Sequence, residues 1–200
     1  MSTQASSLQR REVVGRILRE RADSLVVASL GNPCYDVMAH GDRPDNFYVW
    51  GAMGGTVALA LGLALAQPRR RVLAFVGDGE MMMGLGSLAT VAVQGPLNLS
   101  IVVIDNEHYA ETGMQRSHSG RGVDLSAVAR AVGFEQAHLV RTAAELDRQV
   151  PLLMRNSPGE LVLITIKVGT EPVPMSLPPR DGPYLRSRFR EHLLGASAHA

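Results

Sequence analysis

Cysteine, aromatic residues and an excess of charge are all scarce in this 200-residue chain. Its single cysteine, Cys34, allows no disulfide within the chain, which is in keeping with the reducing interior of a cell. Aromatic residues make up 4% of the sequence and the formal net charge is +1. The stacking platforms and basic surfaces that bind nucleic acids are therefore not expected.

Long hydrophobic runs are also missing, although one stretch needs a closer reading. Residues 47–66 carry no charge and precede a run of three arginines, and a membrane-spanning helix needs about 20 apolar residues. Glycines at positions 51, 54, 55 and 62 instead favour a turn followed by a buried helix. Residues 1–24 hold no apolar core of the signal-peptide kind. We therefore expect a cytoplasmic protein with no membrane partner.

The sequence does contain a strand–helix–strand pattern with polar residues where each strand ends. Residues 72–76 and 99–104 are short apolar runs, typical of buried strands, and a helical stretch joins them. Parallel strands bring their carboxyl ends to one edge of a sheet, where open α/β sheets bind ligands. Asp78 and Asn106 would meet there, and a carboxylate and an amide oxygen are hard ligands suited to Mg²⁺. Taken singly, they would rather be a capping Asp and a turn Asn.

The turn that contains Gly77 and Gly79 adds features suited to a phosphate group. Gly79 lets the backbone pass close to a ligand, and the helix that begins near Glu80 presents free N–H groups and a positive dipole end. Backbone contacts from Gly77, Gly79 and Glu80 to an anion are expected, with an ordinary strand–helix turn as the alternative. A P-loop is excluded, because Leu85 stands where that motif has lysine.

Strand-like and helix-like segments alternate along the whole chain. We expect strands at 25–28, 47–50, 72–76, 99–104, 135–138 and 161–167, and helices at 10–20, 34–39, 56–66, 80–93, 125–132, 143–155 and 184–194. The alternation predicts an α/β fold with a doubly wound, mostly parallel sheet and helices on both faces. One domain should span residues 1–200, with a proline-rich extended segment and a terminal helix at 169–200. Residues 110–122 show neither the helical nor the strand-like spacing of apolar residues, so we expect a loop near the ligand.

Five blocks of sequence, in this order, identify a family. They are SLGNP, DNFYVWGAMGG, GDGEMMMGLGSLAT, DNEHYAETGMQ and DLSAVARAVG. Residues 25–133 resemble the cofactor-binding (beta) subunit of sulfopyruvate decarboxylase and the matching half of phosphonopyruvate decarboxylase. The resemblance implies a thiamine-diphosphate (ThDP) enzyme with Mg²⁺ as second cofactor. Its substrate would be a small anionic 2-oxo acid, cleaved to an aldehyde and CO₂.

The resemblance also implies roles for individual residues. It makes Asp78, Asn106 and the backbone carbonyl of His108 the Mg²⁺ ligands. Met53 would lie between the two rings of the cofactor, near a hydrogen-bonding Gly51 carbonyl; the alternative is a core methionine in a glycine turn. The cofactor-binding set of the resemblance comprises Gly31, Asn32, Gly51, Met53, Gly77, Gly79, Glu80 and Tyr109.

The polar loop after the metal motif is the expected place for substrate groups. Some ThDP decarboxylases carry an acid six residues after the last Asn of the motif. This chain has Thr112 there, with Glu111 one residue earlier, so the catalytic role of that acid does not transfer directly. Together with Met53, these two residues are the catalytic candidates. Arg116 would pair with an anionic substrate group or lie in solvent. Methionines 81–83 are typical of core filling, and we expect at least one to touch the cofactor pocket.

One part of the chemistry is missing from the chain. In the family, a glutamate of a separate pyrimidine-binding domain activates the cofactor, and no glutamate here has that sequence context. We therefore expect an alpha-type partner subunit that supplies it, facing residues 51–62 and 113–122, and a chain that is inactive and self-associating without it. Two alternatives remain open. One is a ThDP enzyme with a carboligation or aldehyde-oxidation outcome, and the other is a non-catalytic ThDP-binding partner.

Overall fold

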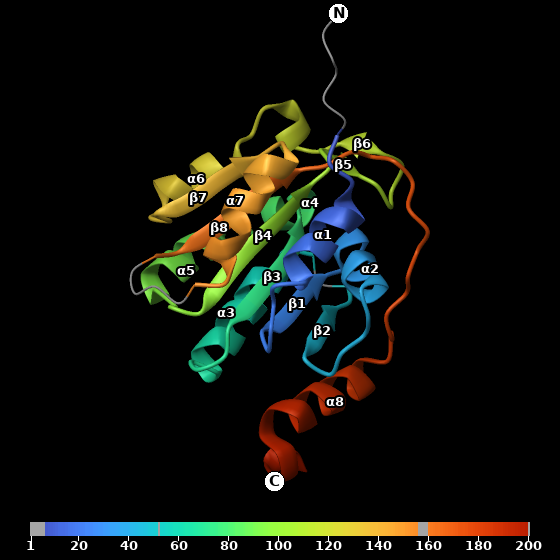
Figure 1. Cartoon of the computed structure of the whole chain (residues 1–200), viewed down its shortest axis with the longest axis vertical. Helices are drawn as coiled ribbons and strands as arrows, with labels where there is room; N and C mark the ends of the chain where they lie inside the picture. Colours follow the sequence, from blue (N-terminus) through green and yellow to red (C-terminus); the bar gives the residue numbers. More distant parts are fainter. Residues whose placement is uncertain (1–6, 52, 156–159, 200) are drawn as a thin grey trace, which may run out of the picture.

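A six-stranded parallel sheet forms the centre of the computed structural model, which describes residues 7–51, 53–155 and 160–199 (Figure 1). The strand order is β2-β1-β3-β4-β8-β7, and every neighbouring pair is parallel. The strands are β1 (Leu25–Ser29), β2 (Asn46–Val49), β3 (Val72–Gly77), β4 (Leu99–Asp105), β7 (Gln136–Val140) and β8 (Val162–Lys167). A two-stranded antiparallel sheet pairs β5 (His108–Tyr109) with β6 (Gln115–Arg116).

Helices cover both faces of the large sheet. They are α1 (Arg10–Leu18), α2 (Asn32–Ala39), α3 (Thr56–Ala66), α4 (Asp78–Met83), α5 (Gly86–Gln94), α6 (Leu125–Ala131), α7 (Ala143–Leu153) and α8 (Gly182–Leu194), with short 3-10 turns at Ser119–Arg121 and Gly195–His199. One buried cluster joins the sheet to α3, α4, α5 and α6, and a second joins its other face to α1, α2 and α7. The expected doubly wound α/β fold is confirmed.

The topology fixes where a ligand can enter. The chain passes from β1 to β2 through α2 on one face of the sheet, and from β2 to β3 through α3 on the other. The strand order therefore changes direction between β1 and β3 (Figure 1). Crevices at the carboxyl ends of strands beside such a switch point are the usual ligand sites of open α/β sheets.

Two local expectations were wrong. The helix expected at 80–93 is broken into α4 and α5, because the backbone of Gly54 packs against Gly84. A Cβ atom on Gly84 would lie 2.2 Å from the Gly54 carbonyl oxygen, so only glycine allows this contact. The loop expected at 110–122 instead contains β6 and the 3-10 turn Ser119–Arg121.

The proline-rich segment crosses the surface of its own chain. The Gly169 N–H donates to the Leu8 carbonyl, Arg11 Nη2 donates to the Pro174 carbonyl, and Trp50 Nε1 donates to the Pro179 carbonyl. These bonds carry the chain past α1 to α8, which lies along the β2 edge of the sheet (Figure 1).

Within the residues described, no helix is both long enough and apolar enough for a bilayer crossing.

Candidate cofactor and metal site

Asp78 and Asn106 meet at the carboxyl edge of the sheet. Strands β3 and β4 are in register up to the pair Gly77 and Ile104, so the residues that follow lie at neighbouring strand ends. Asp78 is 3% exposed and Asn106 is 9% exposed. Both line one cavity of about 150 Å³ that opens between the ends of β1, β3 and β4, at the switch point.

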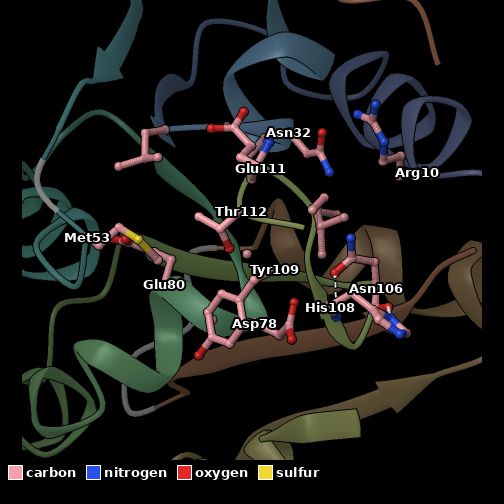
Figure 2. Close-up of a pocket in the computed structure, with 17 residues that line it drawn as sticks. Arg10, Asn32, Met53, Asp78, Glu80, Asn106, His108, Tyr109, Glu111 and Thr112 are labelled. Atoms are coloured by element: carbon pink, nitrogen blue, oxygen red, sulfur yellow. Dashed lines mark hydrogen bonds between the residues drawn. The ribbon is translucent and has the colours of Figure 1, made fainter. Parts of the chain in front are cut away.

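The same cavity collects most of the sequence candidates (Figure 2). Its lining includes Gly31, Asn32, Met53, Gly77, Asp78, Gly79, Glu80, Asn106, His108, Tyr109, Glu111 and Thr112. Gly51 is not among the lining residues, and none of the methionines at 81–83 lines the cavity, although one of them was expected to. Met81 is instead buried in the core, and Met83 faces away into solvent.

Asp78 is held by two serines that the sequence did not single out. Ser117 and Ser119 both donate hydrogen bonds to Asp78 Oδ2, the second at 3.0 Å. Burial raises the pKa of the Asp78 carboxyl, and the nearby Asp105 raises it further, while the serine hydrogen bonds act in the opposite direction. No ion pair found among the described residues involves Asp78. A buried carboxylate without a cation is costly, so its surroundings favour a bound metal ion.

The turn after β4 is shaped by Asn106 itself. Its side-chain oxygen accepts the N–H of His108 at 3.0 Å, and its backbone carbonyl lies 2.8 Å from His108 Nδ1. Glu107 adopts a left-handed conformation with φ 63°, which turns the chain into β5. The hairpin then returns through β6, where the Ser117 N–H donates to the Glu107 carbonyl. The hairpin thereby brings the two serines back to Asp78.

Glu80 supports the far wall of the cavity with its side chain. Its carboxylate accepts the backbone N–H groups of Gly54 at 2.7 Å and Thr56 at 3.1 Å. These bonds anchor the glycine turn that carries Met53, which is 42% exposed and faces the cavity. Figure 2 shows Met53 and Glu80 at one end of the cavity and Asn106 at the other.

Position 79 has room only for glycine, because the Tyr109 side chain packs against it. A Cβ atom there would lie 2.3 Å from the Tyr109 ring, so the ring packs flat against the start of α4. On the opposite wall, a Cβ atom on Gly31 would lie 3.4 Å from the Glu111 carboxyl group. Burial, and then Glu111, raise the pKa of Tyr35 to about 12. Glu111 therefore lies against α2, where it closes the upper side of the cavity.

Arg116 does not line the cavity that contains Asp78. It lines a second, polar cavity of about 320 Å³ with Arg141 and Lys167, beyond the end of β8. Lys167 pairs there with Asp105 at 2.8 Å, and Asp105 accepts a hydrogen bond from Ser119 at 2.7 Å. A chain of polar contacts thus links the second cavity to Asp78.

A family model for thiamine pyrophosphate enzymes, describing their C-terminal TPP-binding domain, matches residues 32–165. The chain belongs to this family. Its sequence is 37% identical over 190 residues to the sulfopyruvate decarboxylase subunit beta of Methanothermobacter thermautotrophicus, covering 95% of this chain and 98% of that one. It is 37% identical over 148 residues to the phosphonopyruvate decarboxylase of Streptomyces viridochromogenes, covering 74% of this chain and 37% of that protein. The resemblance drawn from the five sequence blocks is confirmed.

Solved structures show the TPP-domain fold. Benzoylformate decarboxylase from Polynucleobacter necessarius matches 83% of this chain with a TM-score of 0.66 at 22% identity, and 4-hydroxybenzoylformate decarboxylase from Rhodococcus jostii matches 84% with 0.69 at 16%. The match covers 33% and 34% of those two proteins. The chain therefore spans nearly the whole of a beta-subunit relative and about a third of these larger proteins.

The residues of this TPP-domain cavity fit a magnesium-bound diphosphate. Asp78 provides an uncompensated carboxylate and Asn106 an amide oxygen, the ligand types that Mg²⁺ prefers. The described ranges contain no group of three or more His, Cys, Asp or Glu side chains placed to hold a metal ion, which leaves this mixed donor set as the candidate. Helices α2 and α4 begin at the cavity with Gly31 and Gly77 as caps, and neither cap has a side-chain hydrogen bond. Their free N–H groups suit an anion.

Proposed function

We propose that this chain is the cofactor-binding subunit of a two-subunit ThDP- and Mg²⁺-dependent 2-oxo acid decarboxylase. Its substrate would be a small anionic acid such as sulfopyruvate or phosphonopyruvate, giving an aldehyde and CO₂. The observation that carries the proposal is the buried Asp78, which has no cationic partner among the described residues, beside Asn106 at the switch point of the sheet. The identity to a sulfopyruvate decarboxylase beta subunit over nearly its full length supports the substrate class.

Each wall of the cavity has a part in this proposal. Asp78, Asn106 and the His108 carbonyl would hold the metal, while the backbone of Gly77, Gly79 and Glu80 would hold the diphosphate. Gly31, Asn32 and Tyr109 would complete that end of the cavity. When bound, ThDP supplies a thiazolium carbon that adds to the keto group and an electron sink for the carbon–CO₂ bond.

The opposite end of the cavity would position the rings and the substrate. Met53, on the turn anchored by Glu80, would support the bent cofactor, with the Gly51 carbonyl as a hydrogen-bond acceptor. Glu111 and Thr112 lie on the wall nearest to open solvent, where the carboxyl of Glu111 would exchange a proton with the reacting group.

The proposed subunit arrangement rests on the likeness to a beta subunit. Residues 1–200 would form one diphosphate-binding domain, with residues 169–200 as a strap and terminal helix on its surface. An alpha-type subunit would supply the pyrimidine-binding domain and its glutamate, and the beta chain alone would be inactive. The name of the Methanothermobacter relative, a subunit beta, supports this division.

Reconstitution tests the proposal. The chain is co-purified with the product of a neighbouring gene, supplied with ThDP and Mg²⁺, and assayed for CO₂ release from sulfopyruvate, phosphonopyruvate and pyruvate. Turnover of an anionic acid by the pair, and none by either chain alone, is the expected result. Ligated products would favour a carboligase, and tight ThDP binding without turnover of any acid would favour a non-catalytic binding partner.

A further inference from the structure

Arg10 is a buried arginine in the wall of the ThDP cavity. It is the first residue of α1 and is 7% exposed. Its side chain lines the cavity, at the end that holds Asn32 and Asn106 and away from Met53 (Figure 2). Burying an arginine is costly unless its charge has partners, so this position needs an explanation.

One partner of Arg10 lies outside the cavity. Nη1 of Arg10 forms an ion pair with Oδ2 of Asp36 on α2, a residue with no exposed surface. The guanidinium group has five N–H donors in a planar fork, so an ion pair through Nη1 leaves donors for a second anion. Arg11 pairs with the other oxygen of Asp36, at 3.1 Å, but does not line the cavity. Asp36 therefore has a second cationic partner, Arg11, in addition to Arg10.

The charges around the cavity indicate what that second anion is. Three carboxylates line it, on Asp78, Glu80 and Glu111, and Arg10 is the sole lysine or arginine in the described lining. A diphosphate entering this negative cavity would be repelled unless cations offset the charge. A metal ion on Asp78 would provide one positive centre, and Arg10 is the other that the protein itself supplies.

We propose that Arg10 binds the terminal phosphate of the diphosphate, through the guanidinium N–H donors that its ion pair with Asp36 leaves open. The inference rests on the proposed ThDP-binding function and adds a charged side chain to a diphosphate site otherwise built from backbone groups and a metal ion. Arg10 thereby makes the cavity selective for a diphosphate over a monophosphate. A charge-assisted bond of this kind is worth roughly 10- to 100-fold in affinity.

Calorimetric titration of the full-length chain in Mg²⁺ tests the inference. The ligands are ThDP, thiamine monophosphate and inorganic pyrophosphate, and circular dichroism checks that each variant is folded. Arg10→Met should weaken ThDP and pyrophosphate by about 10- to 100-fold and change the affinity for thiamine monophosphate much less. Arg10→Lys should recover part of the loss, because it keeps the charge but not the fork.

Arg11→Met and Asp36→Asn are the matched controls. Arg11→Met removes a guanidinium group from the same carboxylate, and Asp36→Asn removes the ion pair but keeps the Arg10 charge. Both should retain diphosphate affinity within about threefold of the wild type, less than one charge-assisted bond. Equal loss in all three variants, or an Arg10→Met chain that binds ThDP normally, would overturn the inference. A wild-type chain that binds no ThDP would instead refute the proposed function itself.

Discussion

At the scale of single residues, Asp78 and Asp105 end neighbouring strands, but only Asp105 has a cation partner among the residues described. Lys167 lies 2.8 Å from Asp105, and the Ser119 hydroxyl, with its single proton, lies within hydrogen-bond distance of both carboxylates. The asymmetry is what a metal site requires, since a carboxylate already paired with lysine would compete poorly for a divalent ion. We therefore assign Asp78 to the proposed metal ligands, and Asp105 and Lys167 to the residues that hold the site in place.

Asp78→Asn should abolish cofactor binding without harming the fold. It removes a buried charge that has no protein cation, so the melting temperature of the cofactor-free chain should stay level or rise, while Mg²⁺-dependent ThDP affinity falls by more than about 100-fold. Asp105→Asn is the control, because it removes one of the two carboxylates paired with Lys167, leaves Glu107 as the other, and should lower stability by about 1 kcal/mol. Calorimetry and thermal melts check both. Equal destabilisation in the two variants would contradict the metal assignment.

Cys34 should be inert in the native protein. It is fully buried in α2, its thiol donates to the Ala28 carbonyl at 3.3 Å, and burial raises its pKa far above the ordinary range. A raised thiol pKa leaves less thiolate at any given pH, so a thiol reagent at pH 8 should label the chain only in denaturant. Labelling that proceeds at the same rate with and without denaturant would show that α2 opens readily.

At the scale of elements, Gly84 at the break between α4 and α5 packs against Gly54, in the turn that carries Met53. Helix α4 thereby connects that turn to the turn at Gly77 and Gly79, the proposed diphosphate site. Gly84→Ala should push the Gly54 backbone away and disturb both the Glu80 bonds and Met53. We expect a loss of about 2 kcal/mol in stability together with weaker ThDP binding. Gly86→Ala is the matched control, two residues along in α5, where an added Cβ meets nothing within 4 Å. That variant should be neutral or slightly stabilised, as measured by chemical denaturation.

The elements that the sequence predicted well are those whose signals are local. Each of the six strands of the large sheet overlaps an expected strand, because a fully buried parallel strand is a short apolar run with polar ends. The helices expected at 125–132 and 143–155 are present as α6 and α7, capped by Asp124 and Thr142, and such a cap is a local signal because it involves only the next three residues. Asp78 and Asn106 were predictable together because strand pairing places them at one edge.

The elements that were missed depend on contacts between distant segments. Nothing in the sequence near Gly84 indicates the approach of Gly54, so the helix was predicted to continue. The β5–β6 hairpin requires left-handed backbone at Glu107 and Met114, which are not residues typical of that conformation. The burial of Arg10 was not predicted either, because the helical pattern shows which residues are apolar and does not reveal that Asp36 lies across from it.

At the scale of the whole molecule, the face formed by α3, α4 and α5 exposes apolar side chains. Helix α3 is apolar on every side, and Leu59 and Leu65 on it are exposed together with Met83 on α4 and Val93 on α5. A helix that is apolar all round is normally buried on all sides. We therefore expect another chain to cover this face.

Leu59→Glu should therefore disrupt assembly while sparing the fold. Leu59 is 38% exposed on the half of α3 nearest the cavity, and a charge there would be costly to bury in an interface but not in water. In light scattering after gel filtration, the variant should move toward the mass of one chain, 21.5 kDa, and should fail to reconstitute activity with the partner subunit. Leu177→Glu is the control, since Leu177 is 47% exposed between Pro174 and Pro179, whose carbonyls accept hydrogen bonds from Arg11 and Trp50 on the face of the sheet opposite α3. If both variants assemble like the wild type, the α3 face is not the interface, and the missing glutamate must reach the cavity from the side of Glu111 and the β5–β6 hairpin.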